Sequence, residues 1–490
     1  MTNPAIVWFR QDLRISNNPA LAAALENHER VIPVYIHEQA DSAEWPHGAA
    51  SRWWLHHSLK ALSSSLRELG SRLIIRIGTD SQSVLDELIA QTKTTHVYWN
   101  RLYEPQHIER DKSIKLSLRD RSLEVSSFNS NLLFEPWQIS KNDGGPFRVF
   151  TPFWKACVKS GLPSYPDDAP ERMPAVSTRV KSARLDALEL LPAIRWDSTF
   201  SDHWQPGEAG AHQQLDAFLD RAVMHYQDDR NRPDIEGTSM LSAHLHFGEI
   251  SPQQIIGKTD QTVNISRKQG LVTNAESFIR EIGWREFAYH LLYHFPHTVD
   301  RPLYEYFDDF PWDKNYSANL RAWQQGQTGI PLVDAGMRQL WYSGWMHNRV
   351  RMIVASLLTK NLLIPWQQGA RWFWDTLVDA DLASNTLGWQ WTAGCGADAA
   401  PYFRIFNPVI QAQKFDPTGT YIRQWIPEIA ALPDKYLAQP WTAPAELLHE
   451  QGIKLGKDYP RPIVDLKATR ERALERYQTI KKTSTQTSSG

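Results

Sequence analysis

The chain has 490 residues, of which 42% are hydrophobic and 22% are charged, and its formal net charge is −2. These values exclude an intrinsically disordered chain, and the length favours two domains because single hydrophobic cores rarely grow beyond about 300 residues. The near-neutral charge does not itself indicate a nucleic-acid partner, although a local basic groove still gains affinity for DNA by releasing counterions.

We expect neither a membrane-spanning helix nor secretion. It has no run of about 18 apolar residues, the length needed to cross a bilayer. Its N-terminus lacks a basic stretch followed by an apolar one. Cys157 and Cys395 are its only cysteines. Two cysteines are too few for a disulfide framework or a zinc cluster, so we expect a reducing, cytoplasmic environment.

The first 130 residues alternate short β-rich runs with longer amphipathic stretches. We predict strands at 5–10, 31–37, 72–78, 95–100 and 123–128, and helices at 20–27, 51–69, 81–91 and 106–119. Such alternation predicts an α/β domain with a doubly wound parallel sheet over 1–130. Sheets of this type bind ligands at the carboxyl ends of their strands, but the GxGxxG dinucleotide fingerprint is absent after the first strand.

The rest of the chain changes character twice. Residues 131–205 are rich in Pro, Ser, Asp and Lys, which predicts an inter-domain connection with little regular structure. From 206 to 480, helical patterns are separated by Pro and Gly with no clear strand, which predicts an all-α domain. The polar stretch 481–490 is expected to be a frayed tail. The 21 tryptophans are unusually many, although packing is the ordinary role of any single one.

Two segments of the helical half combine residue types that suit binding. In 236–242, EGTSMLS, small hydroxyl residues either cap a helix or hold a phosphate at its N-terminus. In 278–287, Glu281, Trp284 and Arg285 share one face of a predicted helix. That face is either a solvated stripe or a functional cluster.

Two further segments are also unusual. In 344–352, Asn348 and Met352 lie one helical turn apart, and His347 lacks the paired histidine of a zinc site, which favours a non-metal role. Segment 379–391 brings together two acids, an Asn and two tryptophans within thirteen residues, and segment 398–407, which contains an arginine, follows it. Paired carboxylates are typical of glycosidases, but that interpretation leaves the tryptophans and the α/β domain without a role.

Taken jointly, these four segments, WFRQDLR at 8–14 and FTPF at 150–153 resemble the photolyase–cryptochrome family over nearly the whole chain. The resemblance implies an N-terminal α/β antenna domain and a C-terminal helical domain that holds a U-shaped FAD. It also implies that the protein is an enzyme that uses blue or near-UV light to repair cyclobutane pyrimidine dimers in UV-damaged DNA. A monomer is the expected oligomeric state.

The resemblance places FAD among a defined set of residues. The matching positions are Tyr226, Thr238, Ser239, Met240, Leu241, Ser242, Arg285, Asn348, Arg351, Asp379, Asp381 and Asn385. Fixed cationic and donor groups suit a reduced, anionic flavin. Asn385 matches the position facing flavin N5, where plant-type cryptochromes typically have Asp and animal-type ones Cys. Asn neither competes as an anion nor readily supplies a proton, which favours repair over signalling.

The substrate side is implied in the same way. Enzymes for (6-4) photoproducts resemble this chain but have histidines at the positions of Asn348 and Met352, whereas enzymes for cyclobutane dimers have Asn and Met. Glu281 matches the carboxyl group that binds the flipped bases, and Trp284 and Trp391 match the indoles that form the walls of the dimer pocket.

Two further sets match family positions. Arg230, Arg349 and Arg404 match residues near the DNA backbone, where they would fix the register without reading sequence. Trp389, Trp366 and Trp312 match a chain of tryptophans that reduces the flavin. Each of the three could instead be an ordinary core residue.

The antenna pigment is implied by the NRLYEP sequence at 100–105, which follows a predicted strand. Asn100 and Glu104 are its candidate contacts, and Glu104 matches a folate-contacting acid of folate-type members. This motif resembles that of bacterial class III enzymes. We therefore expect 5,10-methenyltetrahydrofolate as the antenna pigment, with 8-hydroxy-5-deazaflavin as the alternative.

Two rival functions share the same fold and FAD. One is a cryptochrome-type photoreceptor that signals through a protein partner, which Asn385 and the brief C-terminal tail argue against. The other is an electron-transfer flavoprotein without activity on DNA, in which Glu281, Trp284 and Trp391 would have no purpose.

Overall fold

The computed structural model describes residues 4–39, 44–164, 168–266, 268, 270–399 and 404–487. The chain forms two compact units. The first unit comprises Met1–Met224, Ser239–His294 and Val378–Ala380, and the second comprises His225–Thr238, Phe295–Leu377 and Asp381–Gly490. The chain therefore passes from one unit to the other several times, and the predicted change from strands to helices near 206 falls inside the first unit.

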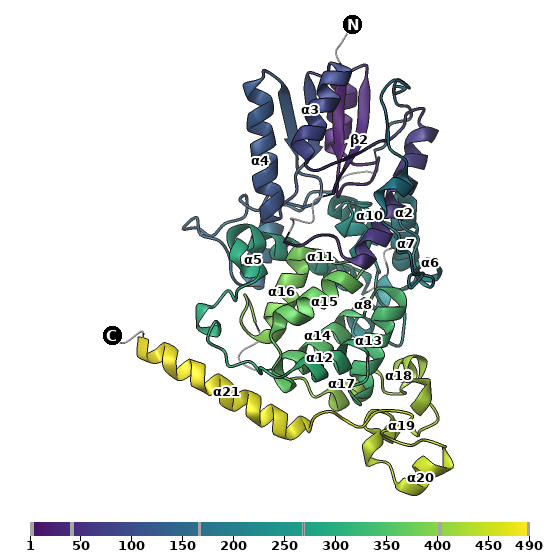
Figure 1. Ribbon diagram of the computed structural model, residues 1–490, viewed down its shortest axis with the longest axis vertical. Coiled ribbons are helices and arrows are strands. Elements are labelled where there is room, and N and C mark those ends of the chain that lie inside the picture. Colours follow the sequence, from purple (N-terminus) through teal and green to yellow (C-terminus); the bar gives the residue numbers. More distant parts are fainter. Residues whose placement is uncertain are drawn as a thin grey trace. The chain divides into compact units, whose positions relative to one another are not determined.

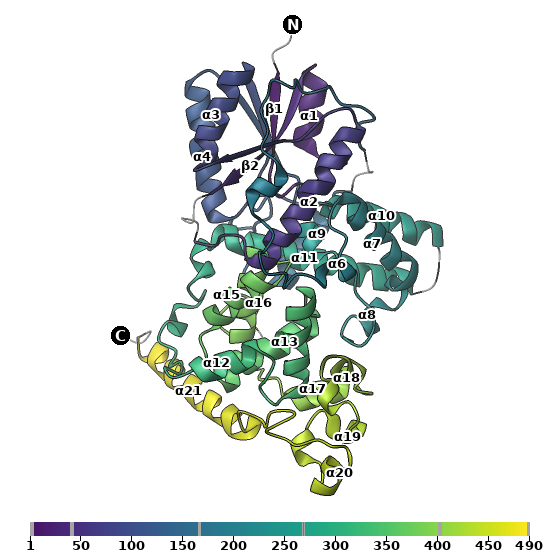
Figure 2. The same cartoon turned by 45° about the vertical axis from the view of Figure 1, so that its right-hand side comes forward.

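A five-stranded parallel sheet forms the α/β part of the first unit. Its order is β3-β2-β1-β4-β5, with the bounds β1 Ala5–Phe9, β2 Val31–Glu38, β3 Ile74–Gly78, β4 His96–Asn100 and β5 Glu124–Phe128. Four helices connect the strands: α1 Pro19–Asn27, α2 Ala49–Glu68, α3 Ser81–Thr92 and α4 Pro105–Asp120. In Figure 2, α1 and α2 lie on one side of the sheet and α3 and α4 on the other. The predicted α/β fold is confirmed.

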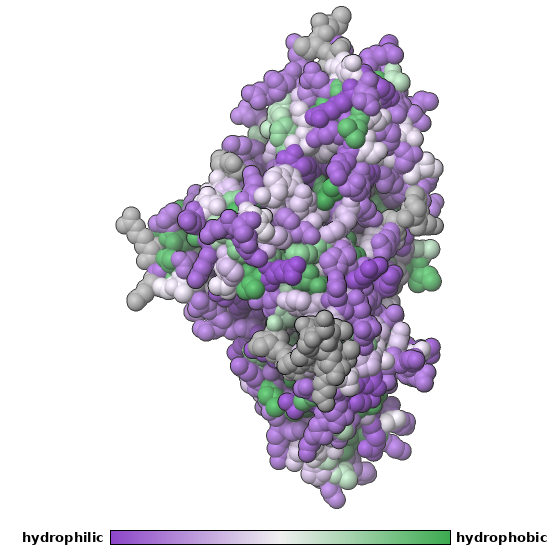
Figure 3. Space-filling view, turned by 90° about the vertical axis from the view of Figure 1, so that its left-hand side faces the viewer, coloured by the Kyte–Doolittle hydropathy of each residue, from purple (hydrophilic) through white to green (hydrophobic). Residues whose placement is uncertain are grey.

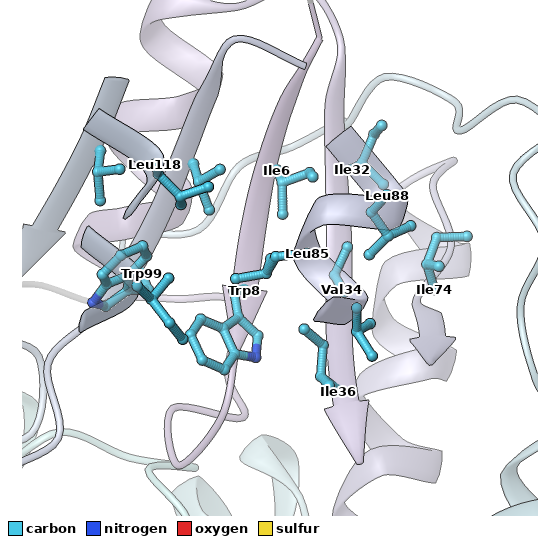
Figure 4. Close-up of a cluster of buried hydrophobic side chains, with 14 of the residues drawn as sticks. Ile6, Trp8, Ile32, Val34, Ile36, Ile74, Leu85, Leu88, Trp99 and Leu118 are labelled. Atoms are coloured by element: carbon cyan, nitrogen blue, oxygen red, sulfur yellow. The ribbon is translucent and has the colours of Figure 1, made fainter. Parts of the chain in front are cut away.

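The core between the sheet and α3 and α4 explains why these runs form strands. The central strand β1 and most of its neighbour β2 are buried on both faces, so these two are nearly continuous apolar runs, whereas the edge strand β5 is mostly polar and only partly buried. Figure 4 shows Trp8 and Trp99 from the neighbouring strands β1 and β4 beside Val34, Leu85 and Leu118. The two indoles pack edge to face, with their ring centroids 5.8 Å apart. The sheet order reverses between β1 and β4, which is where such sheets bind ligands.

The connection at 131–205 contains more regular structure than its composition predicts. It forms α5, Phe150–Lys159, a 3-10 turn at Leu185–Leu188 and the short α6, Phe200–His203. In α5, Phe150, Phe153 and Cys157 are buried and follow a helical spacing. The rest of the first unit is helical: α7 Glu208–Arg221, α9 Ser242–His246, α10 Pro252–Ser266 and α11 Leu271–His294.

The second unit is built from helices, and the only strand pairing among its described residues is an isolated bridge. Its α-helices are α8 Tyr226–Asp229, α12 Ser317–Gln324, α13 Pro331–Ser343, α14 Asn348–Ser356, α15 Trp366–Thr376, α16 Leu382–Ala393, α17 Pro408–Phe415, α18 Thr420–Trp425, α19 Asp434–Leu437, α20 Ala445–Glu450 and α21 Leu466–Thr487. A π-helix at Leu357–Asn361 continues α14. Figure 1 shows α8 in teal and α12 to α21 in green to yellow.

The end of the chain differs from expectation. Helix α21 continues to Thr487, so 481–487 are helical, whereas we predict a frayed tail from 481. The buried residues Ala473, Tyr477 and Ile480 anchor this helix at helical spacing. Once a helix is nucleated, each further residue adds a hydrogen bond, so a polar continuation is tolerated. Residues 488–490 lie outside the described residues.

Among the described residues, no helix is long and apolar enough to cross a membrane. The face in Figure 3 is mostly hydrophilic, with apolar residues in small groups.

Candidate functional site

Glu281 and Trp284 lie on the partly exposed face of α11 in the first unit, and the opposite face of the helix is buried. The indole of Trp284 stacks on the ring of Phe150 at 3.8 Å between centroids, with 10° between the planes. Gly283 lets α11 approach Trp154, because a Cβ at 283 would come within 2.5 Å of the Trp154 ring. The two aromatic residues of α5 therefore fix the orientation of the α11 indole.

Arg285 follows on the same helix and is held by several partners. Its guanidinium donates to the carbonyl oxygens of Asn131 and Leu245 and lies 4.9 Å from the Tyr289 ring centroid. Its neighbour Glu286 is buried, and burial raises the pKa of this carboxyl to about 7. The first unit thus holds the Arg285 guanidinium in a fixed position beside the Glu286 carboxyl group, and burial favours the neutral form of that carboxyl group.

The hydroxyl segment at 236–242 does not end in an ordinary side-chain cap. Leu241 is the N-cap residue of α9, and no side chain caps the helix there. Met240 adopts a left-handed conformation, with φ 53°, which is uncommon for a side chain of this type. Thr238 and Ser239 are partly exposed. The simple capping role that the sequence leaves open is therefore not what these hydroxyls do.

The start of α14 in the second unit brings together the predicted residues of 344–352. Asn348 is exposed and Met352 partly exposed, one turn apart. His347 is the N-cap, and its Nδ1 accepts a hydrogen bond from the backbone N–H of Arg349 at 3.1 Å. Arg351 donates from Nε to the carbonyl oxygen of Met346 at 2.7 Å. Burial and the neighbouring arginines lower the pKa of His347 to about 4, so this imidazole is neutral.

The predicted DNA-contacting arginines lie near one another in the second unit. Arg349 donates from Nη2 to Oδ1 of Asn231 at 2.6 Å. Burial, and then the charges of Arg230 and Arg404, lower the pKa of Arg349. Its guanidinium also lies 4.5 Å from the Phe415 ring centroid. These three neighbouring cations form a local basic patch on a chain of nearly zero net charge.

Helix α16 carries Asn385 and the two tryptophans of the WQW sequence. Asp381 caps the helix by accepting from the backbone N–H of Ser384 at 2.8 Å. Asn385 donates from Nδ2 to the carbonyl oxygen of Ala370 at 3.0 Å, which fixes its amide. Trp391 is partly exposed and lies over Phe406 with centroids 6.5 Å apart. Asp379 and Tyr226 are both buried, within the first and the second unit respectively.

The three predicted electron-transfer tryptophans are also gathered in the second unit. Trp389 and Trp366 are buried, and Trp312 is partly exposed. The Trp389 ring packs against Gly369 of α15, one helical turn from Trp366. Trp366 and Trp312 line the same hollow of about 300 Å³. Of the three indoles, two are therefore buried and Trp312 is the one that reaches solvent.

The predicted antenna residues of the first unit differ in what they contact. Asn100 donates to Asp12 and Asn18 at 2.7 and 2.8 Å, and its oxygen accepts from the backbone N–H of Ala20 at 3.2 Å. Its amide therefore helps to attach the start of α1 to the end of β4. Glu104 is buried at the start of α4 and lies 3.3 Å from His107.

Residues that the sequence does not single out surround His107. Burial lowers the pKa of His107 well below its usual value, and the charges of Arg110, Arg10, His47 and His246 act in the same direction. Arg10 and Arg110 lie 4.5 and 5.0 Å from the Trp8 ring centroid. Arg10 follows β1 and contacts the carbonyl oxygen of Asn100, the last residue of β4, so it lies at the reversal of the strand order. Only Trp8 and Arg10 carry a sequence signal, as part of the WFRQDLR motif.

Comparison with known proteins identifies the family of the chain. The family model for DNA photolyase matches residues 5–175, and that for the FAD binding domain of DNA photolyase matches 278–479. The deoxyribodipyrimidine photo-lyase of Agrobacterium fabrum is 50% identical over 484 residues, 98% of this chain and 99% of that protein. Cryptochrome-2 of Arabidopsis thaliana is 39% identical over 96% of this chain and 78% of its own length.

Solved structures show the same relationship. The crystal structure of a bacterial class III photolyase from Agrobacterium tumefaciens matches with a TM-score of 0.94 and 49% identity, over 98% of both chains. Because similarity of this extent covers both the sheet and the helical parts, the chain belongs to the photolyase–cryptochrome family.

Proposed function

We propose that this protein is a light-driven DNA repair enzyme that binds FAD and splits cyclobutane pyrimidine dimers. The observation that carries the proposal is the 50% identity, over both whole chains, to a deoxyribodipyrimidine photo-lyase. Cryptochromes match at 39%. The two parts of the chain would divide the work, with 1–130 as antenna domain, 131–205 as connection and 206–480 as FAD-binding domain.

The residues present suit FAD. Arg285 and Arg351 are each held by backbone carbonyl oxygens, so these cations need no reorganisation to meet an anionic ligand. The hydroxyls of Thr238 and Ser239 are not used to cap α9 and suit phosphate oxygens. Asn385, fixed by its bond to Ala370, offers a neutral amide where the family faces flavin N5. The other positions of the proposed FAD site are Tyr226, Met240, Leu241, Ser242, Asn348, Asp379 and Asp381.

The proposed roles on the lesion follow from chemistry that each unit presents. When bound, reduced FAD excited by blue or near-UV light supplies one electron that opens the cyclobutane ring and takes the electron back. Trp284 and Trp391 offer flat apolar walls for the flipped bases, and Glu281 offers a carboxylate for their N–H groups. Asn348 and Met352 offer a neutral amide and an adaptable apolar side chain. Each of these side chains would contribute to binding or orienting the dimer.

DNA binding is proposed for the basic patch of Arg230, Arg349 and Arg404. Cations that contact phosphates fix the register and supply affinity that does not depend on sequence. We propose that the enzyme acts as a monomer in the cytoplasm, on DNA that contains pyrimidine dimers.

The antenna proposal is 5,10-methenyltetrahydrofolate at the end of β4, with 8-hydroxy-5-deazaflavin as the alternative. The buried Glu104 and the partly exposed His107 form a polar pair there, beside the cations Arg10 and Arg110. Asn100 would act indirectly, because its amide is engaged with Asp12 and Asn18. The absorption band of the pigment that copurifies with the protein distinguishes the two.

One experiment separates repair from the rival functions. The reduced protein is mixed with an oligonucleotide that contains one thymine dimer, and restored thymines are measured under blue light and in the dark. Repair predicts restoration in the light alone. A photoreceptor or an electron-transfer flavoprotein would leave the dimer intact under both conditions. Glu281→Ala should weaken binding to dimer-containing DNA more than binding to undamaged DNA.

A further inference from the structure

The second unit contains a hollow of about 300 Å³ that the proposed repair reaction does not use. Its walls are formed by Pro302, Phe307, Asp308, Trp312, Pro365, Trp366, Gln367, Gln368 and Cys395. Three aromatic rings therefore face the same space. Rings of this kind favour a flat aromatic guest, which gains both apolar burial and ring stacking. The volume is at the lower end of the range for small-molecule sites, which suits a single ring.

The polar groups of the hollow indicate what such a guest carries. Gln367 donates from Nε2 to the carbonyl oxygen of Asp300 at 2.9 Å, which fixes the orientation of its amide. Its Oε1 is shielded from solvent and has no hydrogen-bond partner among the described residues. Asp308 is exposed and adds a carboxylate at the rim. Both groups accept hydrogen bonds, so the complementary guest has O–H donors.

We propose that this hollow is a binding site for a small phenolic reductant of the hydroquinone type, which re-reduces the tryptophan chain. The inference rests on the proposed function and on the predicted electron-transfer role of Trp366 and Trp312. After Trp312 has lost an electron to Trp366, the bound ring gives one electron to the indole of Trp312. Its O–H bond breaks, the proton passes to water at the rim, and the donor leaves as a phenoxyl radical. Both indoles line the site, so the donor meets the chain directly.

A second hollow provides the comparison. It has a volume of about 520 Å³ and shares Trp312, but its other walls are Pro311, Asp313, Lys314, Asn315, Glu475, Arg476 and Thr479. Arg476 and Arg472 pair with Asp313 at 3.2 and 3.6 Å. Paired charges gain little from contact with an uncharged ring, whereas the three aromatic side chains of the first hollow can stack on it. We therefore assign the reductant to the first hollow.

The test uses 1,4-dihydroxybenzene as the probe. Protein with oxidised FAD is illuminated, and the initial rate of flavin reduction is followed against probe concentration. A site predicts a hyperbola that saturates, whereas collision with an exposed tryptophan predicts a straight line. Gln368→Phe fills the hollow without adding a redox-active ring and should lower the rate at low probe concentration by about tenfold. Glu475→Phe, at the second hollow, should leave the hyperbola unchanged.

Two further measurements make the outcome decisive. In the dark, ligand-observed saturation-transfer NMR should detect the probe on the wild type and on Glu475→Phe but not on Gln368→Phe. A linear rate dependence in the wild type, or a saturating curve unaffected by Gln368→Phe, would overturn the proposal. Repair of a thymine dimer by chemically reduced protein should be equal in all three proteins. Its absence in the wild type would instead refute the proposed function.

Discussion

The indole of Trp389 lies directly on Gly369. A Cβ placed at 369 would come within 2.0 Å of Cη2 of that ring, closer than any real contact. Helix α15 has Gly at this position, so α16 and the indole can approach it to van der Waals distance. This contact sets the position of Trp389 relative to Trp366, which lies one turn earlier on α15.

We expect Gly369→Ala to destabilise the protein through overpacking. The expected cost is about 1–3 kcal/mol, reduced by the better helix propensity of Ala. Trp389→Phe removes Cη2, so the same substitution should cost less than about 1 kcal/mol in that background. Urea unfolding of the wild type, the two single variants and the double variant gives the interaction free energy between positions 369 and 389. An equal cost of Gly369→Ala in both backgrounds would show that the contact is not the cause.

The electron-transfer role of the tryptophans is separable from packing. Trp366→Phe should abolish photoreduction of oxidised FAD and leave dimer repair by the reduced enzyme intact. The control is Trp323→Phe, because Trp323 is also fully buried and lies 6.2 Å from Trp389, yet matches no position in the chain. It should lower stability but keep photoreduction, as measured by the loss of flavin absorbance under blue light. Unchanged photoreduction in Trp366→Phe would remove this residue from the pathway.

The fold was largely predictable because the pattern that determines it is local. Each predicted strand agrees with the observed one to within two residues, since buried parallel strands are short apolar runs. Helix α5 was missed because prolines and polar residues surround it, and its three apolar anchors become meaningful only when they pack inside the unit. Composition averages over such short amphipathic stretches.

The candidate sites were predictable only where a motif marks them. Trp284 and Phe150 both lie in recognisable motifs, so each could be singled out from the sequence. Their stacking could not be predicted, because it depends on the packing of α5 against α11. His47 and His107 come from separate segments and carry no spacing signal, although the charge of His47 acts on His107. The role of Gly369 is likewise invisible until the Trp389 ring is placed against it.

The basic patch makes a prediction about salt. Arg349→Ala should weaken binding to dimer-containing and undamaged DNA by a similar factor, because phosphate contacts carry no sequence information. The slope of log K against log salt concentration should fall by about 0.9, the value for one released counterion. Arg76→Ala removes an arginine that pairs with Glu87 at 3.1 Å and should leave the slope unchanged. Titrations by fluorescence anisotropy at several salt concentrations measure both variants.

Glu286 should make the stability of the protein depend on pH. Burial raises its pKa from 4.5 to about 7, so the folded state favours the neutral carboxyl. A group with a raised pKa contributes its full stability below pH 4.5 and loses it as the pH rises through 7. A shift of this size corresponds to about 3 kcal/mol. Glu286→Gln removes the titration and keeps the shape of the side chain.

The measurement is the difference in unfolding free energy between wild type and Glu286→Gln, because the other titrating groups cancel in that difference. Relative to the wild type, Glu286→Gln should be more stable at pH 8 than at pH 5, with most of the change between pH 5 and 7.5. The backbone N–H of Phe134, which donates to Glu286 at 3.3 Å, keeps an acceptor in the amide oxygen of the variant. A difference that is constant with pH would mean that the carboxyl is solvated in the folded state and that α11 is not sealed at this position.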